Sequence, residues 1–434
     1  NNLTGKQLAI NYQSAYLYLG LIAIILFCGL SAGSYPAFYL ASLKSLDTMR
    51  GIINKNPGNA RFRRALVIFQ FSLSILLIVC TLIIGKQLYY LQNKKLGFYK
   101  DDIGYFACQT PSKDPRLESI KKELGSHPDI LSVTTGFNPN ENEEKVATTG
   151  FSWKGRKEDD YVPFCISSID VDYAKTFQLA LKQGRFFSSE FSTDSAAVVI
   201  NETAAKVIGL EDPIGLEISD GSGRKYNIIG VVRDFHFKSM HQKIDPLLMM
   251  LGADRFIFIK MKHGASASII RFVGKTFESY KFPNRLDFHF LENDLDSLYR
   301  PEQRMSKIFG YFSLLAIIIS CLGLIGLAAF MAERRTKEIG IRKANGAKSN
   351  EIFALLSKEY VMLVIISLLI ASPVAWYAMH KWLENFAYKT IISWWVFALT
   401  AILVMLITML TISLQSYRAA RRNPGGSIKV RVNK

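Results

Sequence analysis

Five stretches of this chain are dominated by apolar residues and contain no Asp, Glu, Lys or Arg. They cover residues 12–43, 66–85, 308–332, 361–380 and 394–417. An α-helix needs about 20 apolar residues to cross a bilayer, so the pattern predicts five transmembrane helices. The second and third helices are separated by about 215 residues of mixed composition. That length is enough to form a globular domain with its own core.

Basic residues near the helix ends indicate how the helices are oriented. Lys and Arg collect in cytoplasmic loops, and three segments are strongly basic: residues 44–64, 333–358 and 418–434. The opposite side is sparse in basic residues. We therefore predict that these three segments face the cytoplasm and that the large domain lies outside the membrane. The short outer loop between the fourth and fifth helices is flanked by three tryptophans typical of membrane interfaces: Trp382, Trp394 and Trp395.

The net charge has two possible explanations. The chain has 53 Lys and Arg against 36 Asp and Glu, which gives a formal net charge of +17. Such a charge is compatible with nucleic-acid binding or with membrane topology. The basic residues cluster beside the apolar stretches, so we favour topology and expect no nucleic-acid partner. The predicted spans lack charged residues, which argues against a proton relay or an ion-coupled transporter.

The predicted organisation is a succession of helices, loops and one outer domain. It comprises residues 1–50 (last helix of an upstream module), 51–62 (cytoplasmic linker), 63–90 (helix and stalk), 91–305 (outer domain, with an insert at about 140–250), 306–332 (helix), 333–358 (cytoplasmic loop), 359–380 (helix), 381–393 (outer loop), 394–417 (helix) and 418–434 (cytoplasmic tail). The first and last helices both leave the membrane into basic segments. We therefore expect a C-terminal portion of a longer, two-module protein; the alternative is a coincidence of two membrane exits.

The outer domain shows the pattern of two strand–helix–strand units far apart in the chain. The first covers residues 103–108, 115–124 and 130–134, and the second covers residues 256–261, 265–280 and 286–291. The segment between them has alternating strand patterns. The predicted fold class is therefore membrane α-helical, with five transmembrane helices, plus an α+β extracytoplasmic domain made of two βαβ units and an inserted mixed subdomain. Residues 86–96 and 291–307 are expected to extend the second and third helices as stalks.

Common catalytic and nucleotide-binding motifs are absent from the sequence. The chain has no Gly-x-x-x-x-Gly-Lys-Ser/Thr loop, no Gly-x-Ser-x-Gly, no His-Glu-x-x-His and no Cys-x-x-Cys. We therefore predict no catalytic, cofactor-binding or metal-binding residues, and no enzyme activity in this chain. Asp234, His236 and His241 could form a metal site, although a strand running into a loop also explains them. Cys108 and Cys165 are both predicted to lie outside the membrane. They could form a disulfide in an oxidising compartment, although nothing in their spacing requires one.

The cytoplasmic segment after the third helix is the most informative. It reads Glu-Arg-Arg-Thr-Lys-Glu-Ile-Gly-Ile-Arg-Lys-Ala-Asn-Gly-Ala over residues 333–347. A solvated helical extension explains the charges but not Gly340 and Gly346, which interrupt a helical pattern. A short amphipathic helix broken by glycines between two spans is well suited to lie on the membrane surface and contact a cytoplasmic partner.

This segment resembles the coupling helix of FtsX-like permeases, the MacB-type membrane subunits of type VII ABC transporters. The tail Arg-Ala-Ala-Arg-Arg-Asn-Pro at residues 418–424 is similar to the family's exit motif, although Gly425 and Gly426 replace bulkier residues. Residues 184–187, 199–205, 212–215 and 229–236 resemble its extracytoplasmic domain. The overall pattern is similar to that of double-module permeases common in Bacteroidetes.

The resemblance implies a mechanical function in a bacterial inner (cytoplasmic) membrane, with the 91–305 domain in the periplasm. A separate cytoplasmic ABC ATPase, which binds ATP and Mg²⁺, would push on the coupling helix, and the permease would bind no cofactor itself. The residues carried over to ATPase coupling are Glu338, Ile339, Gly340, Ile341, Arg342, Lys343, Ala344, Gly346 and Ala347.

The resemblance also implies a dimeric or pseudo-dimeric permease surrounded by membrane lipid, with a periplasmic or outer-membrane partner. The expected process is efflux, lipoprotein or peptide handling, or regulation. A membrane-anchored ligand sensor or binding protein that works without an ATPase is the alternative that stays open.

Overall fold

The computed structural model describes most of the chain. The described residues are 13–41, 57–108, 115–138, 147–148, 150–156, 162–209, 212–252, 256–280, 286–334, 341–342, 345–346 and 349–421. Contacts divide the chain into two compact units. We call Asn1–Ile84, Arg304–Met379 and Ile392–Lys434 the membrane unit, and Gly85–Gln303 with His380–Ile391 the outer unit.

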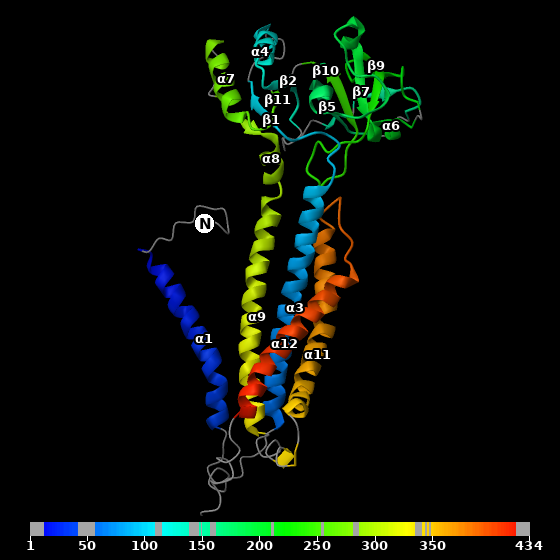
Figure 1. The fold of residues 1–434 in the computed structure, drawn as a ribbon. Helices are drawn as coiled ribbons and strands as arrows, with labels where there is room; N and C mark the ends of the chain where they lie inside the picture. Colours follow the sequence, from blue (N-terminus) through cyan, green and yellow to red (C-terminus); the bar gives the residue numbers. More distant parts are fainter. Residues whose placement is uncertain are drawn as a thin grey trace, which may run out of the picture. The chain divides into compact units, whose positions relative to one another are not determined.

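Five long helices supply the membrane unit (Figure 1). They are α1 (Ala15–Ala41), α3 (Pro57–Asn93), α9 (Arg300–Arg334), α11 (Ser349–Leu383) and α12 (Trp394–Arg421). In the described part of the chain, four segments are long and apolar enough to cross a membrane: Arg61–Asn93, Arg300–Ala328, Ser357–Leu383 and Trp394–Ser413. The described apolar part of α1, Ala15–Leu30, is shorter. Four of the five predicted spans therefore meet this criterion, and the first is a helix that falls below it.

Hydroxyl groups join α3 to its neighbours inside the membrane unit. Ser74 Oγ lies 3.0 Å from Ser320 Oγ of α9, and Thr81 Oγ1 lies 3.1 Å from Ser313 Oγ. On α11, Ser367 Oγ donates to the α3 carbonyl oxygen of Ile68 at 3.0 Å. Such bonds hold helices together where apolar lipid provides no hydrophobic driving force. They make α3 the helix to which α9 and α11 are both bonded.

The outer unit contains one continuous sheet. Its strands are β1 (Ile103–Ala107), β2 (Ile130–Gly136), β3 (Ala147–Thr148), β4 (Ser152–Trp153), β5 (Phe164–Ile169), β6 (Leu181–Gly184), β7 (Ala197–Asn201), β8 (Glu217–Ser219), β9 (Lys225–Val232), β10 (Leu247–Leu251), β11 (Phe256–Met261) and β12 (His289–Phe290). The main path runs β12-β1-β11-β2-β5-β10-β7-β9-β8-β4, with β3 on β5 and β6 on β9.

Two interleaved βαβ units form one end of this sheet. The first is β1, α4 (Pro115–Gly125) and β2, and the second is β11, α7 (Ser266–Ser279) and β12. Because β11 lies between β1 and β2, and β1 lies between β11 and β12, neither unit is complete without the other. Helices α4 and α7 lie side by side on one face (Figure 1) and share a core with the strands. The predicted fold class is confirmed in these elements.

The insert between β2 and β11 holds β3–β10 and three short helices. These are α5 (Tyr173–Thr176), η1 (Ser192–Ala196) and α6 (Glu202–Ile208). The insert continues the same sheet, because Gly136 of β2 pairs with Ile169 of β5. A core that includes Val198, Ile228 and Leu248 lies within it.

Two predicted elements near residue 290 are wrong in detail. The strand predicted at 286–291 shrinks to β12, and residues 291–307 are not one stalk helix. Instead, α8 (Leu291–Ser297) ends before α9 begins at Arg300. Glu292 and Asp294 lie in the first turn of α8, where the helix dipole favours negative charge. Leu291 and Leu295 are buried in the core, which anchors this turn to the sheet.

Candidate functional site

The outer ends of three membrane-spanning helices belong to the outer unit. Residues 85–93 of α3, 300–303 of α9 and 380–383 of α11 are all assigned to it. The outer loop, residues 384–393 between α11 and α12, begins there as well. These segments meet the base loop, which we define as residues 233–246 between β9 and β10. We call this meeting point the junction.

Gln87 of α3 fastens the outer loop. Its side chain is fully buried. Its Nε2 donates to the carbonyl oxygen of Tyr388 at 2.8 Å, and its Oε1 accepts from the amide of Thr390 at 2.8 Å. One side chain therefore satisfies a donor and an acceptor of the loop backbone. The neighbouring Lys86 Nζ donates to the carbonyl oxygen of Ile391 at 2.9 Å. The loop is thus tied to the end of a transmembrane helix by three hydrogen bonds.

His241 of the base loop contacts both the outer loop and α9. Its Nε2 lies 3.2 Å from Glu302 Oε1, and its Nδ1 lies 3.4 Å from the carbonyl oxygen of Asn385. Its ring stacks on Phe386, with centroids 4.4 Å apart. The amide of Ala387 donates to the His241 carbonyl oxygen at 3.3 Å. Through this residue the base loop touches elements that are far apart in the sequence.

Tyr388 is the second contact between the outer loop and the base loop. Its ring packs edge-on against buried His236, with centroids 4.7 Å apart. The Lys94 ammonium lies 3.2 Å from the centre of the Tyr388 ring. Burial, and then the nearby Lys94 charge, lower the pKa of His236 to about 4. His236 is therefore neutral at ordinary pH and can pack in this apolar setting.

A close backbone approach brings the segment after α3 against the base loop. The amide of His236 donates to the carbonyl oxygen of Leu96 at 2.8 Å. Gly97 has φ +85°, and a Cβ there would lie 2.9 Å from the carbonyl oxygen of Asp234. Only glycine fits such a position without strain. The chain leaving α3 is therefore fixed to the base loop.

Tyr299 closes the junction at the break between α8 and α9. It is buried in a cluster with Leu91, Met240 and Phe386. Its hydroxyl oxygen accepts from the amide of Met240 at 3.3 Å. Desolvation raises the pKa of Tyr299, so the hydroxyl stays protonated. The third helix thus reaches the domain through a packed corner, where we predicted a straight stalk.

Trp382 also belongs to this corner. Its ring packs against Phe386, with centroids 4.8 Å apart, and it borders the same cluster. Trp394 is largely exposed, as an interfacial residue would be. Of the three predicted interfacial tryptophans, Trp382 therefore packs on protein.

The open hypotheses about chemistry have clear outcomes in the described residues. There, no three His, Cys, Asp or Glu side chains are grouped to hold a metal ion. His236 and His241 instead pack at the junction. Cys108 and Cys165 lie in different core clusters and are not joined to each other by a disulfide.

Most of the predicted coupling segment lies outside the described residues. Glu338, Ile339, Gly340, Lys343, Ala344 and Ala347 all fall there. Ile341 and Arg342 are helical and exposed, and Gly346 is in an exposed turn with φ +87°. The role of these residues in ATPase coupling stays a prediction.

Comparison with known proteins agrees with this architecture. The FtsX-like permease C-terminal family matches residues 310–424, and the MacB-like periplasmic core domain matches residues 73–272. The chain thus matches the FtsX-like permeases over its membrane helices and the MacB-like periplasmic core domain over its outer part. It is an ABC transporter permease of the MacB and YknZ type, with several membrane spans and a periplasmic domain. The predicted family is therefore confirmed, and membership in it implies an ATPase partner.

Individual relatives are distant. The permease is 23% identical over 331 residues to the uncharacterized ABC transporter permease YknZ of Bacillus subtilis, covering 70% of this chain and 81% of the relative. It is 22% identical over 215 residues to the macrolide export ATP-binding/permease protein MacB 2 of Aeromonas hydrophila, covering 46% of this chain and 33% of the relative. This permease thus spans a third of that export protein.

Two solved structures are similar to part of this chain. The periplasmic region of MacB from Actinobacillus actinomycetemcomitans has a TM-score of 0.34 and 17% identity, covering 48% of this chain and 98% of that structure. The extracellular domain of YknZ from Gram-positive bacteria has a TM-score of 0.31 and 13% identity, covering 43% of this chain and 97% of that structure.

Sequence reasoning did not find the junction. Gln87 falls within the predicted stalk, residues 86–96, and was not singled out, and the outer loop was predicted only as a short connection between two spans. The one indication of the junction in the sequence is the side-chain amide of Gln87. A Gln at the end of an apolar helix needs hydrogen-bond partners if it is buried, but the sequence does not say which partners it finds.

Proposed function

We propose that this permease transmits ATP-driven motion from a separate cytoplasmic ATPase to its periplasmic domain, in the inner membrane of a bacterium. The periplasmic domain then moves a substrate or partner outside the membrane. The chain itself binds no cofactor, because ATP and Mg²⁺ are held by the ATPase. The substrate does not have to pass between the membrane helices, which have no charged side chains within the predicted spans.

The junction is the observation that carries this proposal. Helix α9 runs without interruption from Arg300 to Arg334, a length of about 52 Å at 1.5 Å per residue. Its first residues belong to the outer unit, and the predicted coupling segment follows its last residue. Continuous helices carry rigid-body shifts. A push at one end of α9 therefore has a mechanical route to Glu302 and His241.

The outer loop supports the proposal from a second direction. It is bonded to α3 through Gln87 and to the base loop through His241. Helix α11, which leads into this loop, begins at Ser349, directly after the predicted coupling segment. The coupling segment therefore lies between α9 and α11 in the chain, and the outer ends of both helices belong to the junction.

The coupling segment is assigned its role by position in the family. Glu338 to Ala347 would contact the ATPase. Arg342, which is exposed, and Lys343 would pair with acidic groups on it. Gly346 would allow close approach of the two backbones. Two permease modules, as a dimer or pseudo-dimer, would provide two such segments for an ATPase dimer.

The process served is export or handling outside the membrane. The names of several relatives describe macrolide or pyoverdine export, which favours efflux over lipoprotein or peptide handling and regulation. A periplasmic or outer-membrane partner would then accept the exported compound.

A matched pair of glycine variants tests the coupling role. Gly346 and Gly155 have φ +87° and φ +96°, and a Cβ added at either position would meet open space. Gly346→Trp and Gly155→Trp therefore impose similar strain on opposite sides of the membrane. We expect Gly346→Trp to abolish co-purification of the ATPase from native membranes, and Gly155→Trp to leave it unchanged.

Equal ATPase association of the two variants would overturn the coupling role of this segment. If no ATPase with a phosphate-binding loop co-purifies with the wild-type permease, the result would favour the alternative function, a membrane-anchored ligand sensor that works without an ATPase. Both variants should give the same yield and thermal unfolding profile, which separates loss of binding from loss of folding.

A further inference from the structure

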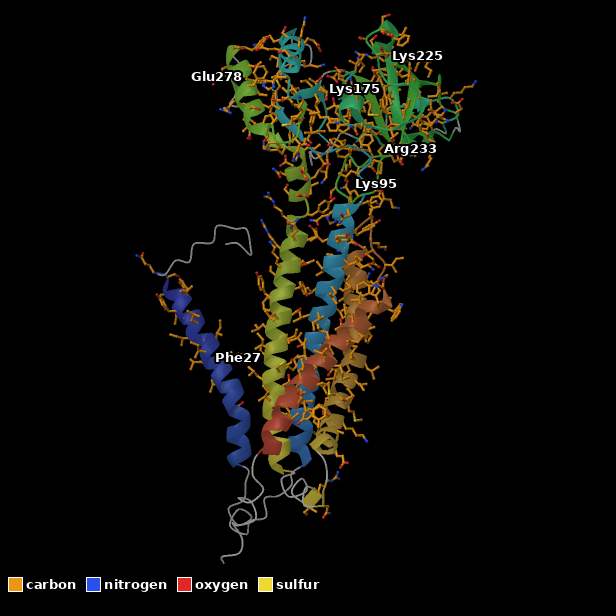
Figure 2. The ribbon with its side chains drawn as sticks, in the orientation of Figure 1. Phe27, Lys95, Lys175, Lys225, Arg233 and Glu278 are labelled. Carbon is orange, nitrogen blue, oxygen red and sulfur yellow. The ribbon has the colours of Figure 1, made fainter. Side chains whose placement is uncertain are left out.

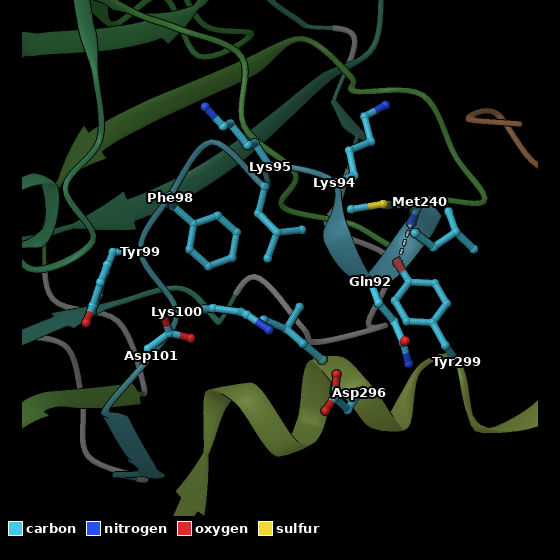
Figure 3. A pocket seen from close by; sticks show the side chains of 13 residues that line it. Gln92, Lys94, Lys95, Phe98, Tyr99, Lys100, Asp101, Met240, Asp296 and Tyr299 are labelled. Carbon is cyan, nitrogen blue, oxygen red and sulfur yellow. Dashed lines mark hydrogen bonds between the residues drawn. The ribbon is translucent and has the colours of Figure 1, made fainter. Parts of the chain in front are cut away.

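A pocket of about 200 Å³ lies beside the junction, within the outer unit (Figure 3). Its walls come from the end of α3, the segment that follows it, the base loop and α8. At about 30 Å³ per water molecule, the pocket holds the volume of several waters. It therefore suits a compact polar group better than a whole lipid chain.

The pocket lies next to the outer ends of two helices that are apolar enough to cross a membrane. Leu91 and Gln92 belong to the last turn of the span Arg61–Asn93, and Tyr299 directly precedes the span Arg300–Ala328. The lining residues continue to Asp101, which is eight positions beyond the end of the span Arg61–Asn93. A group bound here would lie beside the outer ends of these two helices.

The lining combines apolar surface with charges of both signs. Phe98 and Leu96 form apolar wall, and Lys94, Lys95 and Lys100 bring positive charge. Figure 3 shows Lys100 extending between the walls, with Asp296 on the α8 side. The Lys100 ammonium lies 3.9 Å from Glu292 Oε1, which is too long for a good hydrogen bond. Lys100 therefore retains capacity to bind an anion.

Lys94 is committed elsewhere. Its ammonium packs over the Tyr388 ring, and burial lowers its pKa. Lys95 is exposed at the rim. The two lysines able to meet a ligand are thus Lys95 and Lys100, and the carboxylates available on the same lining are Asp101 and Asp296.

We propose that this pocket binds the headgroup of an amine-bearing phospholipid from the periplasmic leaflet. Lys100 and Lys95 contact the phosphate, and Asp296 and Asp101 contact the ammonium. Two features favour this ligand over a free anion. The balance of two lysines and two carboxylates matches a zwitterion, and the position at the ends of two spans supplies the ligand at high local concentration. The inference rests on the pocket alone and does not require ATPase coupling.

Lipid retention by the full-length chain tests this proposal. The permease is reconstituted in nanodiscs that contain phosphatidylethanolamine with a minor fraction of phosphatidylglycerol, and then released for native mass spectrometry. We expect one phosphatidylethanolamine to stay bound to the wild type. Lys100→Gln and Lys95→Gln should each reduce its retention about fivefold, the effect of one basic residue at a lipid surface.

Two further variants control for folding and for charge. Gln92 is an exposed lining residue, so Gln92→Trp should fill the mouth and expel the lipid without disturbing the core. Lys175, labelled in Figure 2, is an exposed lysine of α5 outside the pocket lining. Lys175→Gln removes the same charge and should leave lipid retention unchanged.

Three results would overturn the proposal. Equal retention by the wild type, Lys100→Gln and Gln92→Trp would place the lipid elsewhere. Preference for phosphatidylglycerol would exclude the zwitterionic headgroup. Inorganic phosphate bound in place of lipid, detected by mass, would make the site a free-anion site. Loss of the ATPase partner in Gly346→Trp, by contrast, would leave lipid retention unaffected.

Discussion

Replacing Gln87 with methionine should loosen the outer loop while leaving the helices folded. Methionine has nearly the same length as glutamine and keeps the apolar packing of the stem. It cannot donate to the carbonyl oxygen of Tyr388 or accept from the amide of Thr390, the two bonds that Gln87 now makes at 2.8 Å. The contact of Lys86 with Ile391 remains, so we expect local opening of the loop.

The size of the effect follows from the burial of the two backbone groups. A buried group that loses its partner costs about 1–3 kcal/mol. Tyr388 and Thr390 are partly exposed, so water compensates in part and the lower end applies to each. We expect the free energy of opening the outer loop to fall by about 2 kcal/mol. Because about 1.4 kcal/mol is a factor of ten, the amides should exchange about 30-fold faster.

Hydrogen exchange with mass spectrometry on the full-length chain measures this directly. Peptides that cover residues 384–391 should exchange faster in Gln87→Met, and peptides from β11 should not change. Gln242→Met is the matched control, because Gln242 is an exposed glutamine of the base loop. Equal protection of the outer loop in wild type and Gln87→Met would refute the clamp.

Three further predictions concern the outer unit. Because burial and Lys94 lower the pKa of His236 to about 4 from an unfolded value near 6.5, the unfolded chain binds a proton first as pH falls. The contribution of neutral His236 to the free energy of unfolding is therefore full above about pH 6.5 and should drop by about 3 kcal/mol toward pH 4. Thermal unfolding measured against pH should show a smaller drop for His236→Phe than for the wild type. Identical pH profiles would contradict the lowered pKa of His236. Asp194→Asn removes a buried carboxylate that accepts from the partly exposed guanidinium of Arg185 and should cost about 2 kcal/mol in denaturant unfolding. Lys225→Gln, at an exposed ion pair, should cost less than about 1 kcal/mol. Gly230→Ala places a Cβ 2.2 Å from the Arg185 carbonyl oxygen and should lower the melting temperature by several degrees. Gly274→Ala, in an open position of α7, should raise the melting temperature slightly. A higher melting temperature for Gly230→Ala than for Gly274→Ala would show that the sheet backbone shifts to accommodate the added Cβ.

Much of the secondary structure could be predicted because each pattern reports on its own segment. The predicted strand at 130–134 became β2, and the predicted helix at 265–280 became α7. The two βαβ units were predicted from their repetition, whereas the interleaving of their strands is seen only in the structure. The strand predicted at 286–291 was too long, because acidic residues at 292 and 294 favour the start of a helix over a longer strand.

The coupling segment and the junction differ in how far the sequence alone predicts them. The coupling segment was recognised by its motif, and its contacts stay a prediction. The junction was not recognised at all. Its central bonds join Gln87 to residues 301 and 303 positions away, and His241 to a residue 144 positions away. No periodicity within a segment encodes such a pairing.

By itself, the sequence determined where the long apolar helices lie, that the outer domain is built from two βαβ units, and which family the chain resembles. These follow from apolar length, local alternation and contiguous motifs, which are all properties of neighbouring residues. Only the tertiary structure decided that the outer loop is bonded to α3 and the base loop, that α8 and α9 are separate helices, and that lysines and carboxylates share a pocket. Those features depend on buried polar groups finding partners across the fold, and the identity of a partner is fixed only when the chain has packed.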